Sequence, residues 1–263
     1  MQKLNNFKAV AAALLFSLSA AVQAGQSCEG SEIEPLELMN SLELALKTQT
    51  ALQQAGAETA VIARVGQDLS QYGLRYSHLG LVQKQSDGRY TVLHELNECG
   101  SEQSDLYVEG LGNFFLDDVH AFEVLILLPP AQVQQKLNSL MQGSLPRNIH
   151  HKKYSMLSYA FATDYQNSNQ WGLELMAHAL SEESLSDRAS VQKWLKQQSY
   201  QPGIINVDPL KRLGASVFKA NVSFTDHPLK SRLKGQYQVV TVESVEQFLL
   251  QQQPKTQRMV LTQ

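Results

Sequence analysis

Runs of apolar residues predict four strands in the first half of the chain. The runs cover residues 60–65, 76–82, 90–96 and 121–128. Ser86, Asp87 and Gly88 stand between the second and third runs, and these turn-forming residues predict that the two strands pair as a hairpin. Pro129 and Pro130 end the fourth run, because proline cannot continue a strand ladder.

Apolar residues spaced three and four apart predict helices elsewhere. The predicted helices cover residues 36–55, 131–142, 167 onward, and 186–198. Pro202 and Gly203 break the chain, and residues 204–263 are predicted to hold two strands, a short helix over 244–252 and a polar tail. Because the hairpin strands are partly segregated from the helices, we expect an α+β fold with an antiparallel sheet flanked by helices.

The N-terminus has the pattern of a secretory signal peptide. Lys3 and Lys8 form a basic head, an apolar stretch runs to Val22, and Val22 and Ala24 stand at the spacing that a signal peptidase reads. The stretch is shorter than the roughly 20 residues of a membrane span, which makes an uncleaved anchor the less favoured alternative. We therefore expect residues 1–24 to be removed near Ala24, no later transmembrane segment, and a periplasmic mature chain over 25–263.

Composition excludes one class of partner. The chain carries 22 basic and 25 acidic residues, and this balance gives no reason to expect nucleic acid as a partner. The mature chain of about 240 residues can form one α+β domain with its own core. No sequence feature indicates a nucleotide, haem or flavin. The acidic pair at 117–118 with Glu109, and the histidines at 150–151, lack metal-ligand spacing, so we expect neither a cofactor nor a metal.

Cys28 and Cys99 are the only cysteines. In an oxidising compartment an even number predicts a disulfide. The pair would close a loop of about 70 residues and stabilise the fold by about 4 kcal/mol. The alternative is a nucleophilic Cys99, with His94 five residues earlier. A reactive thiol would be prone to oxidation in that compartment, which favours the disulfide.

Three positions carry side chains able to do acid–base or nucleophilic chemistry. His78 begins a strand with Gly80 two residues later, and His94 lies on the partner strand of the predicted hairpin. Ser168 stands where the helix from Asn167 begins, and there the helix dipole and free N–H groups stabilise an anion. Each position also has a structural interpretation, as a hydrogen-bonded strand histidine or as a helix cap.

Five further residues are candidates for substrate contacts. Asn169 and Gln170, together with Asn167, could supply an oxyanion donor at the helix start, although polar residues are ordinary there. Tyr76 and Arg64 lie near the His78 strand and could contact a substrate carboxylate or carbonyl. Core packing and an ion pair are the favoured interpretation of these two side chains.

Several motifs together resemble a bacterial family known as domain of unknown function 2145. The stretches that carry the resemblance are Ala63-Arg64-Val65-Gly66-Gln67-Asp68-Leu69, Leu74-Arg75-Tyr76-Ser77-His78-Leu79-Gly80, Gly112-Asn113-Phe114-Phe115-Leu116-Asp117-Asp118, Tyr165-Gln166-Asn167-Ser168-Asn169-Gln170-Trp171 and Arg212-Leu213-Gly214-Ala215. The resemblance covers nearly the whole mature chain. It brings no established activity.

A more distant resemblance suggests a mechanism. A Ser-His-x-Gly strand, a polar residue on the next strand and an Asn-nucleophile pair at a helix start are similar to permuted NlpC-type papain-like domains. The resemblance implies His78 as the base, His94 as the residue that orients it, and Ser168 in the place of the usual cysteine. A serine hydroxyl is a far weaker acid than a thiol and needs a well-placed base.

Two functions follow from this resemblance as expectations. The first is a hydrolase or acyltransferase that acts on amides or esters of cell-envelope material through Ser168, His78 and His94. The second is a non-catalytic domain whose cleft binds an envelope ligand or a protein partner.

Overall fold

The structure, a computed structural model, describes residues 33–117, 119–208 and 220–263. Its elements in chain order are α2 (Pro35–Gln54), β1 (Thr59–Val65), η1 (Ser70–Tyr72), β2 (His78–Lys84), β3 (Tyr90–Asn97), β4 (Ser104–Gly110), α3 (Leu111–Leu116), β5 (Ala121–Leu128), α4 (Ala131–Gln142), α5 (Leu145–Asn148), α6 (Ser168–Leu180), α7 (Arg188–Gln197), β6 (Gly203–Asn206), α9 (Leu229–Lys234), β7 (Gln236–Val239), α10 (Val242–Gln252) and β8 (Gln257–Thr262). The described residues belong to one compact unit.

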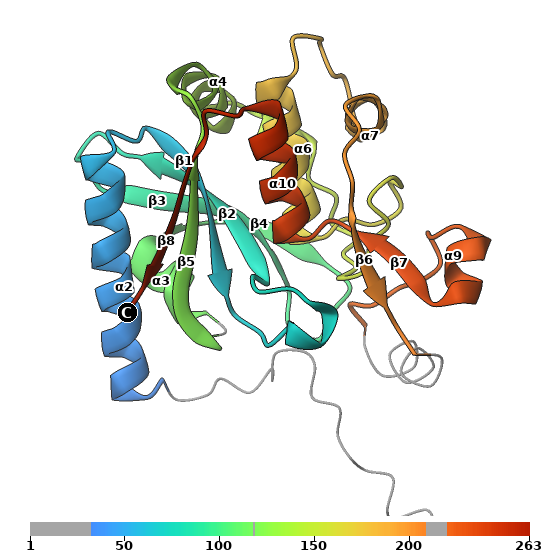
Figure 1. Ribbon diagram of the computed structural model, residues 1–263, viewed down its shortest axis with the longest axis horizontal. Helices are drawn as coiled ribbons and strands as arrows, with labels where there is room; N and C mark the ends of the chain where they lie inside the picture. The colour runs from blue at the N-terminus through green and yellow to red at the C-terminus, as the bar shows by residue number, and fades with distance from the viewer. Residues whose placement is uncertain (1–32, 118, 209–219) are drawn as a thin grey trace, which may run out of the picture. The chain divides into compact units, whose positions relative to one another are not determined.

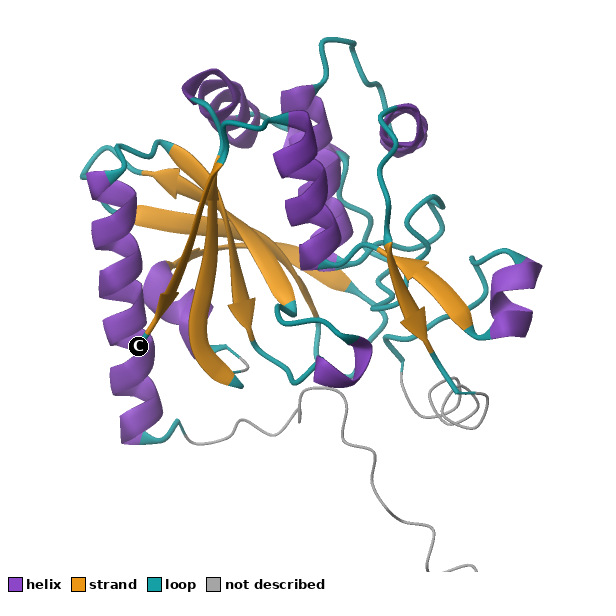
Figure 2. Ribbon diagram, viewed as in Figure 1, coloured by secondary structure: helices purple, strands orange, loops and turns teal. Residues whose placement is uncertain are grey.

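Six antiparallel strands form the main sheet in the order β4-β3-β2-β1-β5-β8 (Figures 1 and 2). Strand β1 lies inside the sheet and all seven of its residues are buried, because both faces of the sheet are covered. The α+β class and the antiparallel sheet flanked by helices are therefore confirmed. The β6–β7 pair forms a separate two-stranded sheet beside α9.

Alternating side chains divide the core into two layers. On one face Val61, Ala63 and Leu79 pack with apolar residues of α4, α6, α7 and α10. On the other face Ile62 and Val82 pack with α2 and α3. Figure 1 shows α6 and α10 together on one side of the sheet and α2 on the other.

Three elements of this fold differ from the sequence prediction. The segment expected to be a polar tail contains β8, which pairs with β5 and forms one edge of the sheet. Strand β4 at the opposite edge and the short helix α3 were not predicted at all. Both edge strands are half-exposed, so they lack the continuous apolar run that marks a buried strand.

The signal-peptide prediction concerns residues 1–24, which lie outside the described residues. Cys28 lies outside them as well, so its pairing with Cys99 stays a prediction; Cys99 is not a free thiol. Within the described part of the chain, no helix combines the length and the hydropathy that a bilayer crossing requires.

Candidate functional site

His78 and His94 meet at the place where two strands separate. The β2–β3 pairing starts at Leu81 and Leu93, so neither histidine lies within the paired segment. Their rings approach edge to face, and Nε2 of His78 lies 2.9 Å from Nδ1 of His94. His94 is fully buried and His78 is 9% exposed. The structure thus brings together two of the three residues of the predicted catalytic group.

Gly80 makes room for this pair. A Cβ atom built on Gly80 would lie 2.4 Å from Cγ1 of Val92 and 3.4 Å from Cβ of His94. Phe114 of α3 closes the same space, with its ring centroid 5.9 Å from that of His78 and 5.3 Å from that of His94. The glycine in the Ser-His-x-Gly motif therefore has a packing reason, since any larger side chain would displace Val92 or the second histidine.

Glu109 of β4 extends the histidine pair. Its Oε2 lies 3.3 Å from Nε2 of His94, at ion-pair distance although not aligned as a hydrogen bond. A carboxylate at this position favours the proton on Nε2 of His94, so that Nδ1 of His94 accepts the hydrogen bond from Nε2 of His78. In that tautomer Nδ1 of His78 carries no proton and is the basic atom of the site.

Electrostatics keep the His78 ring neutral. Burial lowers its pKa well below the ordinary value, and the neighbouring Arg64 and His94 side chains lower it further. A neutral imidazole with a free nitrogen is the form that a general base requires.

Arg64 and Tyr76 have partners within the protein. The Arg64 guanidinium donates to the carbonyl oxygen of Phe114 and pairs with Asp117. The Tyr76 hydroxyl donates to Oε1 of Glu123 at 2.8 Å. Burial and this hydrogen bond raise the pKa of Tyr76. These contacts fit the packing and ion-pair interpretation and leave neither side chain turned toward a substrate.

The start of α6 is held against the His78 strand. The side chain of Asn167 caps the helix by accepting a hydrogen bond of 2.8 Å from the backbone N–H of Gln170. Asn169 accepts a hydrogen bond of 3.1 Å from the N–H of Leu79 and donates one of 3.4 Å to the carbonyl of Ser77. Asn169 therefore ties the first turn of α6 to the residues on both sides of His78.

Ser168, the third predicted residue, lies in this turn but contacts a different group. It is the first residue of α6 and is 6% exposed. Burial and the neighbouring Glu95 carboxyl raise the pKa of Tyr154, and contact with the Ser168 side chain opposes that shift. Among the hydrogen bonds of the described residues, none joins Ser168 to His78 or His94. Gln170 is occupied as well, since its Oε1 accepts from Ser158 at 2.7 Å.

With this geometry in place, comparison with known proteins identifies the family. A model of an uncharacterised protein family conserved in bacteria, domain of unknown function 2145, matches residues 51–249. The chain belongs to this family. The matched residues include His78, His94 and Ser168. No curated protein and no solved structure matches the chain.

A buried cluster of charged and amide side chains in this family member was not predicted. Glu174 of α6 pairs with Arg188 of α7, with Nε and Oε2 2.8 Å apart. Gln166 and Gln192 also donate to the Glu174 carboxylate, at 2.7 and 3.3 Å. One sequence signal existed: Glu174 stands between Leu173 and Leu175 in a helix that is otherwise apolar on nearly every side.

Glu95 of β3 is a second buried acid, next to His94 in sequence but on the opposite face of the strand. It is fully buried, and neither carboxyl oxygen has a well-aligned hydrogen-bond partner. Burial raises the pKa of Glu95 to about 8; Ser104 and Arg188 lower it, and Glu174 raises it. The Glu95 carboxyl is therefore protonated in the folded protein at neutral pH.

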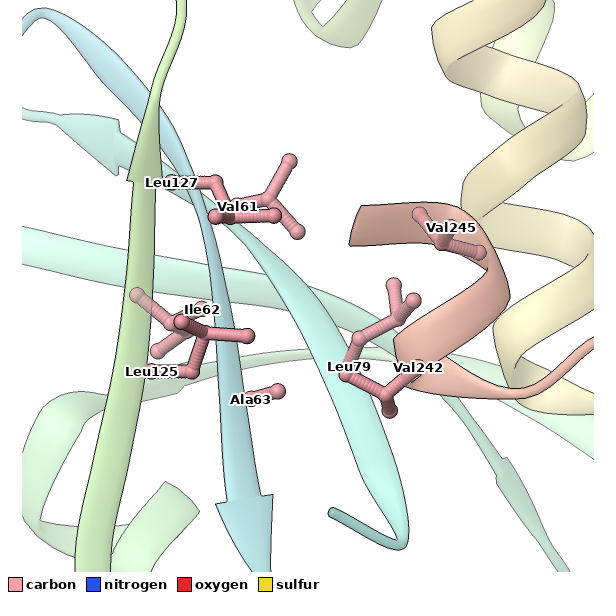
Figure 3. Close-up of a pocket in the computed structure, with 8 residues that line it drawn as sticks. All are labelled: Val61, Ile62, Ala63, Leu79, Leu125, Leu127, Val242 and Val245. Carbon is pink, nitrogen blue, oxygen red and sulfur yellow. The ribbon is translucent and has the colours of Figure 1, made fainter. Parts of the chain in front are cut away.

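Open space near the site is limited. A seam between the sheet and α10 is lined by apolar side chains, including Leu79, Leu125 and Val245, and has no room for a water molecule (Figure 3). A depression of about 420 Å³ lies instead along α7, between Phe161 and Lys196.

Among the described residues, no group of three or more acids, histidines or cysteines has the arrangement of a metal site. His150 is hydrogen-bonded to Ser104 at 3.1 Å.

Proposed function

We propose that this protein is an exported hydrolase or acyltransferase of the cell envelope, with a permuted papain-like site in which serine replaces cysteine. Its substrate would be an amide or ester, such as a peptide or an acyl group. The observation that carries the proposal is the ordered series Glu109, His94, His78, on a strand that Asn169 ties to the first turn of α6.

The chemistry would proceed by acyl transfer. Nδ1 of His78 takes the proton of the Ser168 hydroxyl as Oγ attacks the carbonyl carbon, and the same proton then passes to the leaving amine or alcohol. The resulting acyl-serine ester is released by water or by an acceptor alcohol or amine. Free N–H groups in the first turn of α6, a helix of 13 residues, favour the negative charge on the carbonyl oxygen. The reaction requires the Ser168 hydroxyl to turn from Tyr154 toward His78.

Covalent labelling with a fluorophosphonate tests this proposal without knowledge of the substrate. We expect the mature protein to be labelled at Ser168, Ser168→Ala to take no label, and His78→Gln to react at least about 100-fold more slowly. Ser190→Ala, at the start of α7, is the matched control and should be labelled like the wild type. An unlabelled wild type, or a label that persists in Ser168→Ala, would contradict the proposal.

The contact between Ser168 and Tyr154 favours a second candidate, a papain-like domain that binds an envelope ligand or protein without turnover. For this function the histidine pair has a structural role. The two candidates differ in the labelling experiment, because a binding domain leaves Ser168 unreactive.

A further inference from the structure

Ser168 belongs to a second group of buried polar side chains, separate from the histidine pair. Glu95 of β3 faces α6, which packs on this strand. Glu95 also lies near Tyr154, in the connection that leads to α6, and the Tyr154 side chain contacts that of Ser168. All three side chains are buried. They are called here the Tyr154 cluster, and the exclusion of water strengthens hydrogen bonds within it.

The backbone fixes Tyr154 in this cluster. Its N–H donates to the carbonyl of Glu102 at 2.7 Å, and the residue forms an isolated parallel bridge with Gln166. Gln166 is itself anchored, since its amide donates to the Glu174 carboxylate at 2.7 Å. The Tyr154 ring therefore keeps its neighbours, while its hydroxyl hydrogen remains able to turn from one acceptor to another.

The Glu95 carboxyl has hydrogen-bonding capacity to spare. Neither of its oxygens has a well-aligned partner, although Ser104 of β4 and Arg188 of α7 are close. Ser104 is already hydrogen-bonded to His150 at 3.1 Å. The three guanidinium nitrogens of Arg188 are directed at another carboxylate and at two backbone carbonyls. The Tyr154 hydroxyl is the remaining neighbour able to accept the proton of the Glu95 carboxyl.

We propose that Glu95 is a positioning residue for Ser168 and acts through the Tyr154 hydroxyl. The protonated Glu95 carboxyl donates to the Tyr154 oxygen, and the Tyr154 hydroxyl donates to Oγ of Ser168. In this direction the serine proton points away from Tyr154 and is available to the base. The inference rests on the proposed function, because it names the residues that turn the Ser168 hydroxyl for that reaction.

Ionisation of Glu95 reverses the direction of both hydrogen bonds. A carboxylate can only accept, so Tyr154 then donates to Glu95, and the Tyr154 oxygen accepts the hydrogen of Ser168. The serine proton is now directed at Tyr154 and withheld from the base. Burial raises the pKa of Glu95 to about 8. The protonated form, present below this pH, is the reactive one, and the reactivity of Ser168 should fall as pH rises through 8.

The other titratable groups around Glu95 keep their charge near this pH. Burial lowers the pKa of His150, whose ring is therefore neutral, and burial raises the pKa of Tyr154, which keeps its proton. Arg188 stays cationic. Burial also raises the pKa of Glu174, but Arg188 and two amide side chains oppose that shift. Replacing Glu95 alone separates its titration from that of Glu174.

The rate of fluorophosphonate labelling at Ser168, followed from about pH 6 to about pH 9.5, tests the inference. We expect the wild-type rate to fall about tenfold per pH unit above about pH 8. The fall should be absent in Glu95→Gln, whose amide donates at every pH, and in Tyr154→Phe, which interrupts the cluster. The exposed Glu182→Gln is the matched control and should keep the wild-type profile. Circular dichroism at each pH should show all four proteins folded.

A labelling rate in the wild type that does not fall, or a fall that persists in Glu95→Gln, would overturn the inference and leave the proposed function standing. Nuclear magnetic resonance of protein labelled with carbon-13 at Cζ of tyrosine tests the cluster without a reaction. We expect the Tyr154 resonance, assigned with Tyr154→Phe, to shift in one step near pH 8 in the wild type and not in Glu95→Gln. A wild type that takes no label contradicts the proposed function, whereas a Tyr154 resonance without this step overturns the inference.

Discussion

Replacing Arg188 with alanine is expected to lower the free energy of unfolding by about 3–5 kcal/mol, because it leaves a buried carboxylate without its cation. Arg188 does more than pair with Glu174. Its two terminal nitrogens donate to the carbonyl oxygens of Thr163 and Tyr165, at 3.1 and 3.0 Å. These bonds fix the loop that leads into the Asn167 cap, so we also expect the start of α6 to become mobile.

Urea denaturation at pH 7 measures this loss. Arg89→Ala is the matched control: Arg89 also pairs with an acid, Asp87, but its side chain is 79% exposed, and such a surface pair contributes less than about 1 kcal/mol. Adding Glu174→Gln to Arg188→Ala should recover at least about 1 kcal/mol, since it removes the stranded charge. If the Arg188 and Arg89 variants lost the same stability, burial of the Glu174–Arg188 pair would not make it more stabilising than an exposed ion pair.

Replacing Glu95 with glutamine is expected to stabilise the protein at neutral pH. The pKa of this carboxyl is raised by burial from 4.5 to about 8. Between these values the folded state holds a proton that the unfolded state has released, so stability falls as pH rises from 4.5 to 8. Glutamine cannot ionise, and the advantage of the variant should reach about 3 kcal/mol at pH 7, at about 1.36 kcal/mol per pH unit.

Denaturation from pH 4.5 to 8.5 gives the difference in the free energy of unfolding between Glu95→Gln and the wild type. This difference reports the titration of the Glu95 carboxyl alone. Contributions from the histidines occur in both proteins and cancel. The difference should be small at the acid end, grow through neutral pH and level off above about pH 8. The exposed Glu182→Gln serves as the control for a change of charge alone. A difference that does not vary with pH would show that the Glu95 carboxyl titrates alike in the folded and unfolded states.

Local sequence patterns predicted the central parts of the fold well. The 76–82 and 90–96 runs, separated by a Ser-Asp-Gly turn, are the β2–β3 hairpin, and the hairpin is what brings His78 and His94 together. The helix start at Asn167 was also visible, because asparagine is a strong cap and an apolar helix follows it. These features depend on neighbours along the chain.

Features that depend on distant neighbours were missed. Strand β8 pairs with β5, more than a hundred residues earlier in the chain, and its apolar run of three residues is too short to mark a strand in a polar segment. Glu109 was considered only as a cation ligand and rejected for its spacing, yet it reaches His94 because β4 pairs with β3. The contact of Ser168 with Tyr154 depends on the polar connection before α6, for which the sequence offered no periodic pattern.

The measurement that tests the central claim most directly is the pKa of the thiol introduced by Ser168→Cys, obtained from the ultraviolet absorbance of the thiolate as a function of pH. The two native cysteines are controlled by the same titration of the wild type. If the His78 ring accepts the proton of the introduced thiol, the thiolate will form at a pH well below the ordinary thiol pKa of about 8.5, and this pKa will rise in Ser168→Cys/His78→Gln. A thiol pKa at or above about 8.5 that does not change when His78 is replaced would contradict the account.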